Sequence, residues 1–197
     1  QYAAILAYIL SAKFMAAGEH IKFINAQIKS LHSAAQLPHF AHSLAEHCGK
    51  TIPHNKSDVG QVKSFPILIS DFWEDLASVE KQIKQLSANN FRGLVIQVTS
   101  PAELSLPYKG RVILEPTSAD SAENFTISKI EDVKKEYTQR IETHQREIMH
   151  ITNQYGCQYI HLSTARDPID ATMDIYRSLA GLAPEATPNA SNTEAER

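Results

Sequence analysis

Short, continuous apolar runs alternate along this chain with longer segments in which apolar residues recur at helical spacing. The run Phe65–Ser70 (FPILIS) is apolar up to its final serine, and Leu94–Val98 (LVIQV) is apolar at nearly every position. Runs of this kind predict strands that are buried on both faces. Asp71 directly follows the first run, and Leu76–Leu86 has the spacing of a helix. The pattern therefore predicts a strand–loop–helix unit with an acidic residue at the end of the strand.

The same alternation continues on both sides of this unit. Helices are predicted over Tyr2–Ala17, Ala34–Cys48, Ile130–Tyr155 and Pro168–Leu179, and strands over Ile21–Ile24, Arg111–Leu114, Phe125–Ile127 and Tyr159–Leu162. Alternating helices and strands predict an α/β fold with a mostly parallel sheet and helices on both faces. We expect one domain over residues 1–181. Residues 182–197, rich in Pro, Ala, Ser, Asn and Glu, are expected to form a disordered tail.

Composition excludes several classes of protein. A chain of 197 residues with 43% hydrophobic and 21% charged residues is typical of a globular domain. A net charge of −3 provides no basic field for nucleic acid. No segment reaches the roughly 18 uninterrupted apolar residues of a membrane helix. Cys48 and Cys157 lack metal-type spacing, so we expect reduced thiols and a cytoplasmic location.

Asp71 is the strongest candidate for a functional side chain. Ligands of open α/β sheets bind at the carboxyl ends of strands. With Ser70 beside it, Asp71 is therefore a candidate ligand of a hard cation such as Mg²⁺. An equally weighted alternative is that Asp71 or Ser70 caps the following helix. We expect Glu74 and Asp75 to interact with the dipole at the start of that helix.

Other chemistry has less support in the sequence. Trp73 is expected either to anchor its loop or to form the rim of a binding site. The residues His39, His42, His47, Cys48 and His54 match no zinc signature, and solvated histidines are the favoured interpretation. There is no G-x-S-x-G motif, and the seven glycines form no phosphate-binding loop.

Several motifs, taken in order, carry a family resemblance. They are ILISDFWED at Ile67–Asp75, PAELSLPYKG at Pro101–Gly110, a long helix with Tyr137 and His144, and HLSTARDP with IYRSLAG between His161 and Gly181. In order and spacing they resemble the bacterial von Willebrand factor A-like family known as domain of unknown function 58. The resemblance covers most of the chain and implies a Rossmann-like three-layer αβα sandwich.

The resemblance also implies a metal-ion-dependent adhesion site. In the family this site combines D-x-S-x-S after the first strand, a threonine from a second loop and an aspartate after a later strand, which Asp71 matches. The D-x-S-x-S motif would precede the helix at Tyr2–Ala17. We therefore expect the chain to be truncated, with the first strand missing and only Asp71 and Ser70 left as a partial metal site. Tight Mg²⁺ binding is expected only in a longer protein, because Mg²⁺ takes about six oxygens.

Relatives in this family accompany MoxR-type AAA+ ATPases. The resemblance thus implies a non-enzymatic protein-interaction module, an adaptor or co-chaperone that binds an AAA+ ATPase or its client. Trp73 and Glu103 are the predicted partner-binding residues. The alternative is a Mg²⁺-dependent hydrolase of the doubly wound α/β class, in which Asp71 and Glu103 act as paired carboxylates. A third hypothesis leaves Asp71 with a purely structural role as a helix cap.

Overall fold

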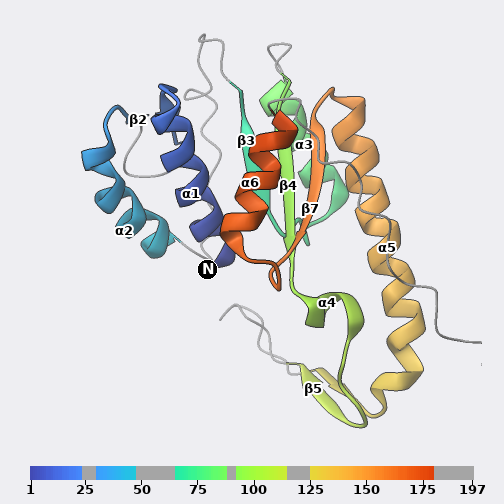
Figure 1. Ribbon diagram of the computed structural model, residues 1–197. Coiled ribbons are helices and arrows are strands. Elements are labelled where there is room, and N and C mark those ends of the chain that lie inside the picture. The colour runs from blue at the N-terminus through green and yellow to red at the C-terminus, as the bar shows by residue number, and fades with distance from the viewer. Residues whose placement is uncertain (24–29, 48–64, 88–91, 115–124, 180–197) are drawn as a thin grey trace, which may run out of the picture. The chain divides into compact units, whose positions relative to one another are not determined.

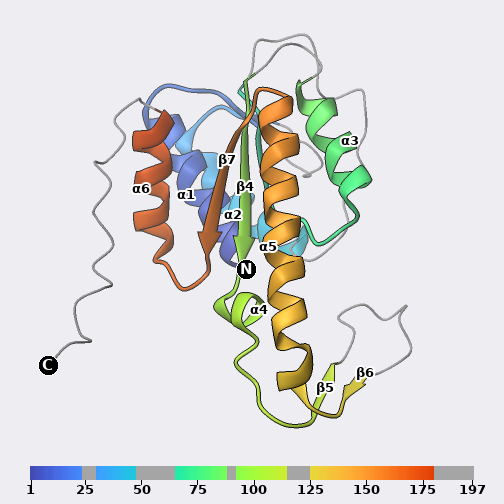
Figure 2. The ribbon, with the colours of Figure 1, turned by 90° about the vertical axis from the view of Figure 1, so that its right-hand side faces the viewer.

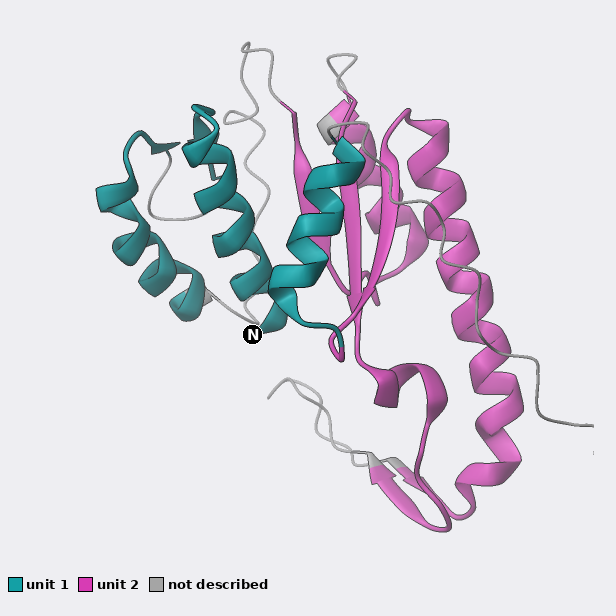
Figure 3. Ribbon diagram, viewed as in Figure 1, with its two compact units in different colours: residues 1–52, 166–197 teal, residues 53–165 magenta. Residues whose placement is uncertain are grey.

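The computed structural model describes residues 1–23, 30–47, 65–87, 92–114 and 125–179. The chain divides into two compact units, shown in Figure 3. Unit 1 combines Gln1–Ile52 with Arg166–Arg197, and unit 2 is Pro53–Ala165. The expected single domain over residues 1–181 stays a prediction, and the expected tail over residues 182–197 lies outside the described residues.

Unit 2 is built around a three-stranded parallel sheet with the order β3-β4-β7 (Figure 1). Its strands are β3 (Ile67–Ser70), β4 (Leu94–Thr99) and β7 (Gln158–Ser163). All six residues of the central strand β4 are buried, as the continuous apolar run predicts. The predicted α/β fold with parallel strands is confirmed at this level. The finer prediction of a three-layer sandwich stays a prediction.

Two helices of unit 2, α3 (Leu76–Ser87) and α5 (Ile130–Gln154), contribute side chains to its core. They pack against each other, and α5 also packs on β7. The core cluster comprises Phe72, Val79, Ile83, Val95, Ile148 and Cys157. Figure 2 shows α5 running along the sheet and continuing past the carboxyl ends of the strands toward β5 and β6. The helix therefore packs on the core and also runs beside the carboxyl ends of the strands, the edge of the sheet where ligands usually bind.

The strands β5 (Val112–Leu114) and β6 (Phe125–Ile127) form a separate antiparallel pair. Both strands were predicted, but their pairing apart from the parallel sheet was not. After β4 the chain enters the short helix α4 (Pro101–Ser105), which the sequence analysis missed, and Leu106 then takes a left-handed φ of 40°. This turn directs the chain away from the sheet. The backbone carbonyl of Gly110 accepts a hydrogen bond from the amide of Ile130, which ties the pair to the start of α5.

Unit 1 is mainly helical. Its elements are α1 (Tyr2–Ala16), β1 (Ile21–Lys22), β2 (Ser30–Leu31), the 3-10 turn η1 (Ala34–Gln36), α2 (Leu37–His47) and α6 (Pro168–Leu179). Helix α1 packs against α2 and α6, and Leu6, Leu10, Phe40 and Ile175 are buried. Gly18 follows the end of α1 with a left-handed φ of 85°, a conformation that glycine adopts without strain. The strand predicted at Ile21–Ile24 is shorter than expected and pairs with β2, which was not predicted.

Within the described part of the chain, no helix is both long enough and apolar enough to span a membrane.

Candidate functional site

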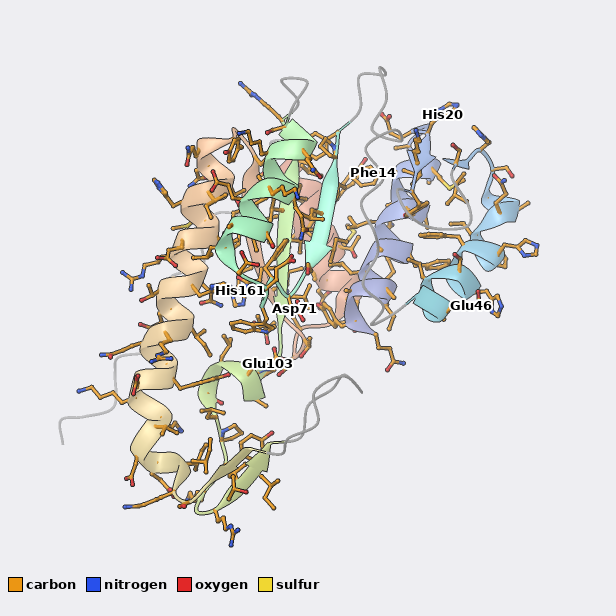
Figure 4. All side chains as sticks on the ribbon, turned by 180° about the vertical axis from the view of Figure 1, so that it is seen from behind. Phe14, His20, Glu46, Asp71, Glu103 and His161 are labelled. Atoms are coloured by element: carbon orange, nitrogen blue, oxygen red, sulfur yellow. The ribbon has the colours of Figure 1, made fainter. Side chains whose placement is uncertain are left out.

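One face of the parallel sheet changes from apolar to polar along its strands. Side chains two residues apart share a face of a strand. In register, Leu68, Val95 and Tyr159 form a row that packs against the core cluster. The next row on the same face is Ser70, Gln97 and His161, and the last contains Thr99 and Ser163. We call these two rows the polar end of the sheet. Figure 4 shows Asp71, His161 and Glu103 at this end.

A buried amide at the polar end holds the backbone that follows β3. Gln97 is fully buried, and its side-chain nitrogen donates a 2.9 Å hydrogen bond to the carbonyl of Asp71. The hydroxyl of Tyr159 donates a 2.5 Å bond to the amide oxygen of Gln97. Because the carbonyl of Asp71 can only accept a hydrogen bond, the amide nitrogen of Gln97 must face it, and the amide oxygen is left to accept from Tyr159. Burial raises the pKa of Tyr159 to about 12, so this donor stays protonated at neutral pH.

A second support comes from α5. Nε2 of His144 donates a 2.6 Å hydrogen bond to the carbonyl of Phe72. Phe72 is fully buried and has a φ of 56°, a left-handed conformation that is unfavourable for a bulky residue. The ring of His144 also stacks on Trp73, with a centroid distance of 5.6 Å and an interplanar angle of 16°. We call Asp71, Phe72 and Trp73 the 71–73 loop.

The two outer residues of the 71–73 loop remain accessible. Asp71 is exposed, and 39% of Trp73 is exposed. The carboxylate of Asp71 makes one long hydrogen bond, of 3.4 Å, from the hydroxyl of Ser70. The same hydroxyl accepts a 3.3 Å bond from the amide of Phe72. The loop therefore presents a carboxylate and an indole on either side of a buried anchor.

The helix cap is a different acid. Asp75 precedes α3, and its carboxylate accepts bonds from the amide of Ser78 at 3.0 Å and from the hydroxyl of Ser78 at 2.7 Å. These bonds lower the pKa of Asp75. The alternative that Asp71 or Ser70 caps this helix is wrong, because the chain runs four more residues before α3 begins. The expectation that Asp75 interacts with the start of the helix is confirmed.

His161 and Thr99 form a second pair at the polar end. Oγ1 of Thr99 lies 2.7 Å from Nε2 of His161, and the amide nitrogen of Gln145 lies 3.4 Å from the same ring atom. The tautomer of His161 decides which of these atoms donates. Burial lowers the pKa of His161, which favours the neutral ring. Thr99 is only 1% exposed, so its hydroxyl is not placed to attack a substrate.

Glu103 is occupied by its own helix. Its carboxylate accepts a 2.7 Å bond from the amide of Ser100, and the hydroxyl of Ser100 accepts a 3.2 Å bond from the amide of Glu103. This reciprocal arrangement is a capping box, and the S-x-x-E spacing of the sequence could have indicated it. The pKa of Tyr137 on α5 is raised, chiefly because the side chain is partly buried and to a smaller extent because of the negative charge of Glu103. A partner-binding role for Glu103 stays a prediction.

The donors of the polar end do not fit a complete magnesium site. Mg²⁺ requires about six oxygens in octahedral geometry, whereas the hydroxyls of Ser70 and Thr99 are already hydrogen-bonded. Among the described residues, no group of three or more His, Cys, Asp or Glu lies together. Mg²⁺ binding through Asp71 and Ser70 therefore stays a prediction that requires further ligands. Of the histidine group, His42 pairs with Glu46 at 3.3 Å, while Cys48 and His54 lie outside the described residues.

Comparison with known proteins adds no further constraint. No protein-family model, no curated protein and no solved structure matches this chain. The site is therefore interpreted from its own residues.

Sequence reasoning singled out Asp71, Ser70, Trp73 and Glu103, but it gave their supports no role, and it named His144 and His161 only as part of the family resemblance. Gln97 and Thr99 gave a further signal, as polar residues at alternate positions of an otherwise apolar run. Their partners, Tyr159 and His161, are 62 residues away in sequence. Only the register of β4 and β7 brings these residues together.

Proposed function

We propose that this chain is a non-enzymatic protein-interaction module whose partner binds the 71–73 loop. The observation that carries the proposal is the support of this loop by two side chains from different elements. Gln97 holds the carbonyl of Asp71, and His144 holds the carbonyl of Phe72. Binding surfaces gain affinity when their contact residues are ordered before the partner arrives.

The chemistry of the loop favours binding over catalysis. Tryptophan is enriched among the residues that dominate binding energy at interfaces, and Trp73 is both exposed and held by His144. A hydrolase with Asp71 and Glu103 as paired carboxylates has less support, because Glu103 is engaged in its capping box. Thr99 beside His161 is buried, so this pair lacks an accessible nucleophile.

The resemblance to von Willebrand factor A-like proteins suggests the partner. In this proposal the module is an adaptor or co-chaperone for a MoxR-type AAA+ ATPase or for its client. A bound Mg²⁺ belongs to the proposal only if ligands from outside the described residues complete the site.

The test is the affinity of this chain for the MoxR-type AAA+ ATPase of the same source, measured by calorimetry with and without Mg²⁺. Trp73→Ala is expected to weaken binding by about tenfold or more, which corresponds to about 1.4 kcal/mol. Glu142→Gln, an exposed change on α5, is the control and should leave the affinity unchanged. Equal affinities for the wild type and for both Trp73→Ala and Asp71→Ala would contradict the proposal.

Hydrolase activity has a separate test. Phosphatase or nuclease turnover that requires Mg²⁺ and is lost in Asp71→Asn would replace the binding proposal with an enzymatic one.

A further inference from the structure

We propose that the 71–73 loop binds an arginine side chain of the partner protein, with the guanidinium stacked on Trp73 and paired with Asp71. This inference rests on the proposed function and specifies the chemistry of the group that the loop recognises.

The first observation is that Trp73 is a fixed aromatic surface. The ring of His144 stacks on the indole at 5.6 Å, and the same histidine is bonded to the carbonyl of Phe72. Phe72 is fully buried, so the loop is anchored on the core side. With 39% of Trp73 exposed, part of the indole remains open to a ligand. Tryptophan is the best side chain for binding a cation over its ring.

The second observation is the charge around this indole. Residues 70–75 carry three acids, Asp71, Glu74 and Asp75, and neither Lys nor Arg. Asp75 is committed to the amide and hydroxyl of Ser78, and Glu74 accepts a hydrogen bond from Gln82. Asp71 has no cationic partner within the described parts of the chain, and the hydrogen bond that it accepts from Ser70 is long. An exposed carboxylate without a cation therefore lies two residues from an exposed indole.

The backbone limits how far apart these two residues can lie. The Cα atoms of Asp71 and Trp73 are at most about 7.6 Å apart, because consecutive Cα atoms are about 3.8 Å apart. A guanidinium can stack on an aromatic face and donate two parallel hydrogen bonds to a carboxylate. Lysine ammonium is a more strongly hydrated point charge that makes no such planar contact. Arginine is thus the side chain that uses both groups of the loop.

Binding of an arginine differs from the other mode considered for this loop, in which a carboxylate of the partner binds through a metal ion. Without a complete set of metal ligands in the described residues, a partner carboxylate would meet Asp71 and Glu74 as like charges, which disfavours binding.

The test uses the 197-residue chain and three short capped peptides that are identical except for a central Arg, Lys or Glu. Trp73 is the only tryptophan of the chain, so its fluorescence reports binding directly. The arginine peptide is expected to give a saturable change with an affinity at least threefold higher than that of the lysine peptide. Asp71→Asn should weaken arginine binding about fivefold or more. Glu142→Gln removes an equal charge elsewhere and should have no effect.

Three results would overturn the inference. They are no response to the arginine peptide, equal affinities for arginine and lysine, and a response that Asp71→Asn leaves unchanged. If the glutamate peptide bound only when Mg²⁺ was present, the loop would instead be assigned to a carboxylate of the partner. These outcomes can be told apart from a failure of the proposed function. If the arginine peptide failed to bind but Trp73→Ala still weakened binding of the ATPase, the proposed function would be supported and only the arginine inference would be wrong.

Discussion

The two ends of one face of the parallel sheet in unit 2 differ in what holds them together. At the amino end, Leu68 and Val95 pack against Ile148 and Val79 in an apolar cluster. At the carboxyl end, side chains in the same strands meet through hydrogen bonds, as Thr99 does with His161, and the hydroxyl of Tyr159 reaches Gln97 from the apolar row. Apolar burial is non-directional and supplies stability, whereas a satisfied polar network fixes one geometry. The comparison shows that apolar packing at one end of the sheet supplies stability, whereas hydrogen bonds at the other end fix the geometry of the side chains and of the 71–73 loop.

The largest effect is expected at the apolar end. Ile148→Ala removes a fully buried side chain from the core cluster, and it should lower the free energy of unfolding by about 2–5 kcal/mol. Chemical denaturation measures this loss. The comparison would fail if this variant were no less stable than variants of the polar end.

A smaller loss is expected at the polar end. Tyr159→Phe leaves the buried amide oxygen of Gln97 without its donor, which should cost about 1–3 kcal/mol. Fluorescence of Trp73 should also change, since the loop loses a support.

Tyr159 also predicts a pH dependence. Its pKa is raised to about 12 in the folded state, against about 10 in the unfolded chain. The contribution of Tyr159 is therefore fully present below pH 10 and is lost as the pH rises toward 12. Stability measured across this range should fall less steeply in Tyr159→Phe. Identical slopes would contradict the burial of this hydroxyl.

His161 predicts the opposite dependence in acid. Burial lowers its pKa in the folded state, so the unfolded chain binds the proton first. Stability should be intact above about pH 6.5, the ordinary value for histidine, and should decline as the pH falls through the lowered folded pKa. His161→Gln should remove part of this decline. The measurement is the unfolding midpoint from pH 7.5 to 5.

The smallest effect separates two neighbouring acids. Asp75→Ala removes the cap of α3 and should lower the thermal midpoint, whereas Asp71→Ala should leave it nearly unchanged. A loss in Asp71→Ala as large as that in Asp75→Ala would restore Asp71 as a structural residue and remove it from the candidate site.

The apolar end could be predicted from the sequence because burial on both faces leaves a continuous apolar run. Residues Ile67–Ser70 and Leu94–Thr99 form strands close to the expected bounds. The strands β5 and β6 were predicted close to their observed bounds, but their pairing apart from the parallel sheet was not, since the left-handed turn at Leu106 gives no clear signal in the sequence.

The candidate site was predicted only in part for a related reason. Asp71 and Trp73 are local features of one motif, but their supports come from distant elements. His144 lies 72 residues from Phe72, and Gln97 lies 26 residues from Asp71. Such contacts depend on strand register and on the docking of α5, which a pattern along the chain does not specify.

The most direct measurement is the time-resolved fluorescence anisotropy of Trp73, the only tryptophan, in the wild type and in His144→Ala. If the 71–73 loop is held ready for a partner, the wild-type indole should show little fast local motion, and His144→Ala should add a large nanosecond component. Equal, large local motion in both proteins would contradict the account.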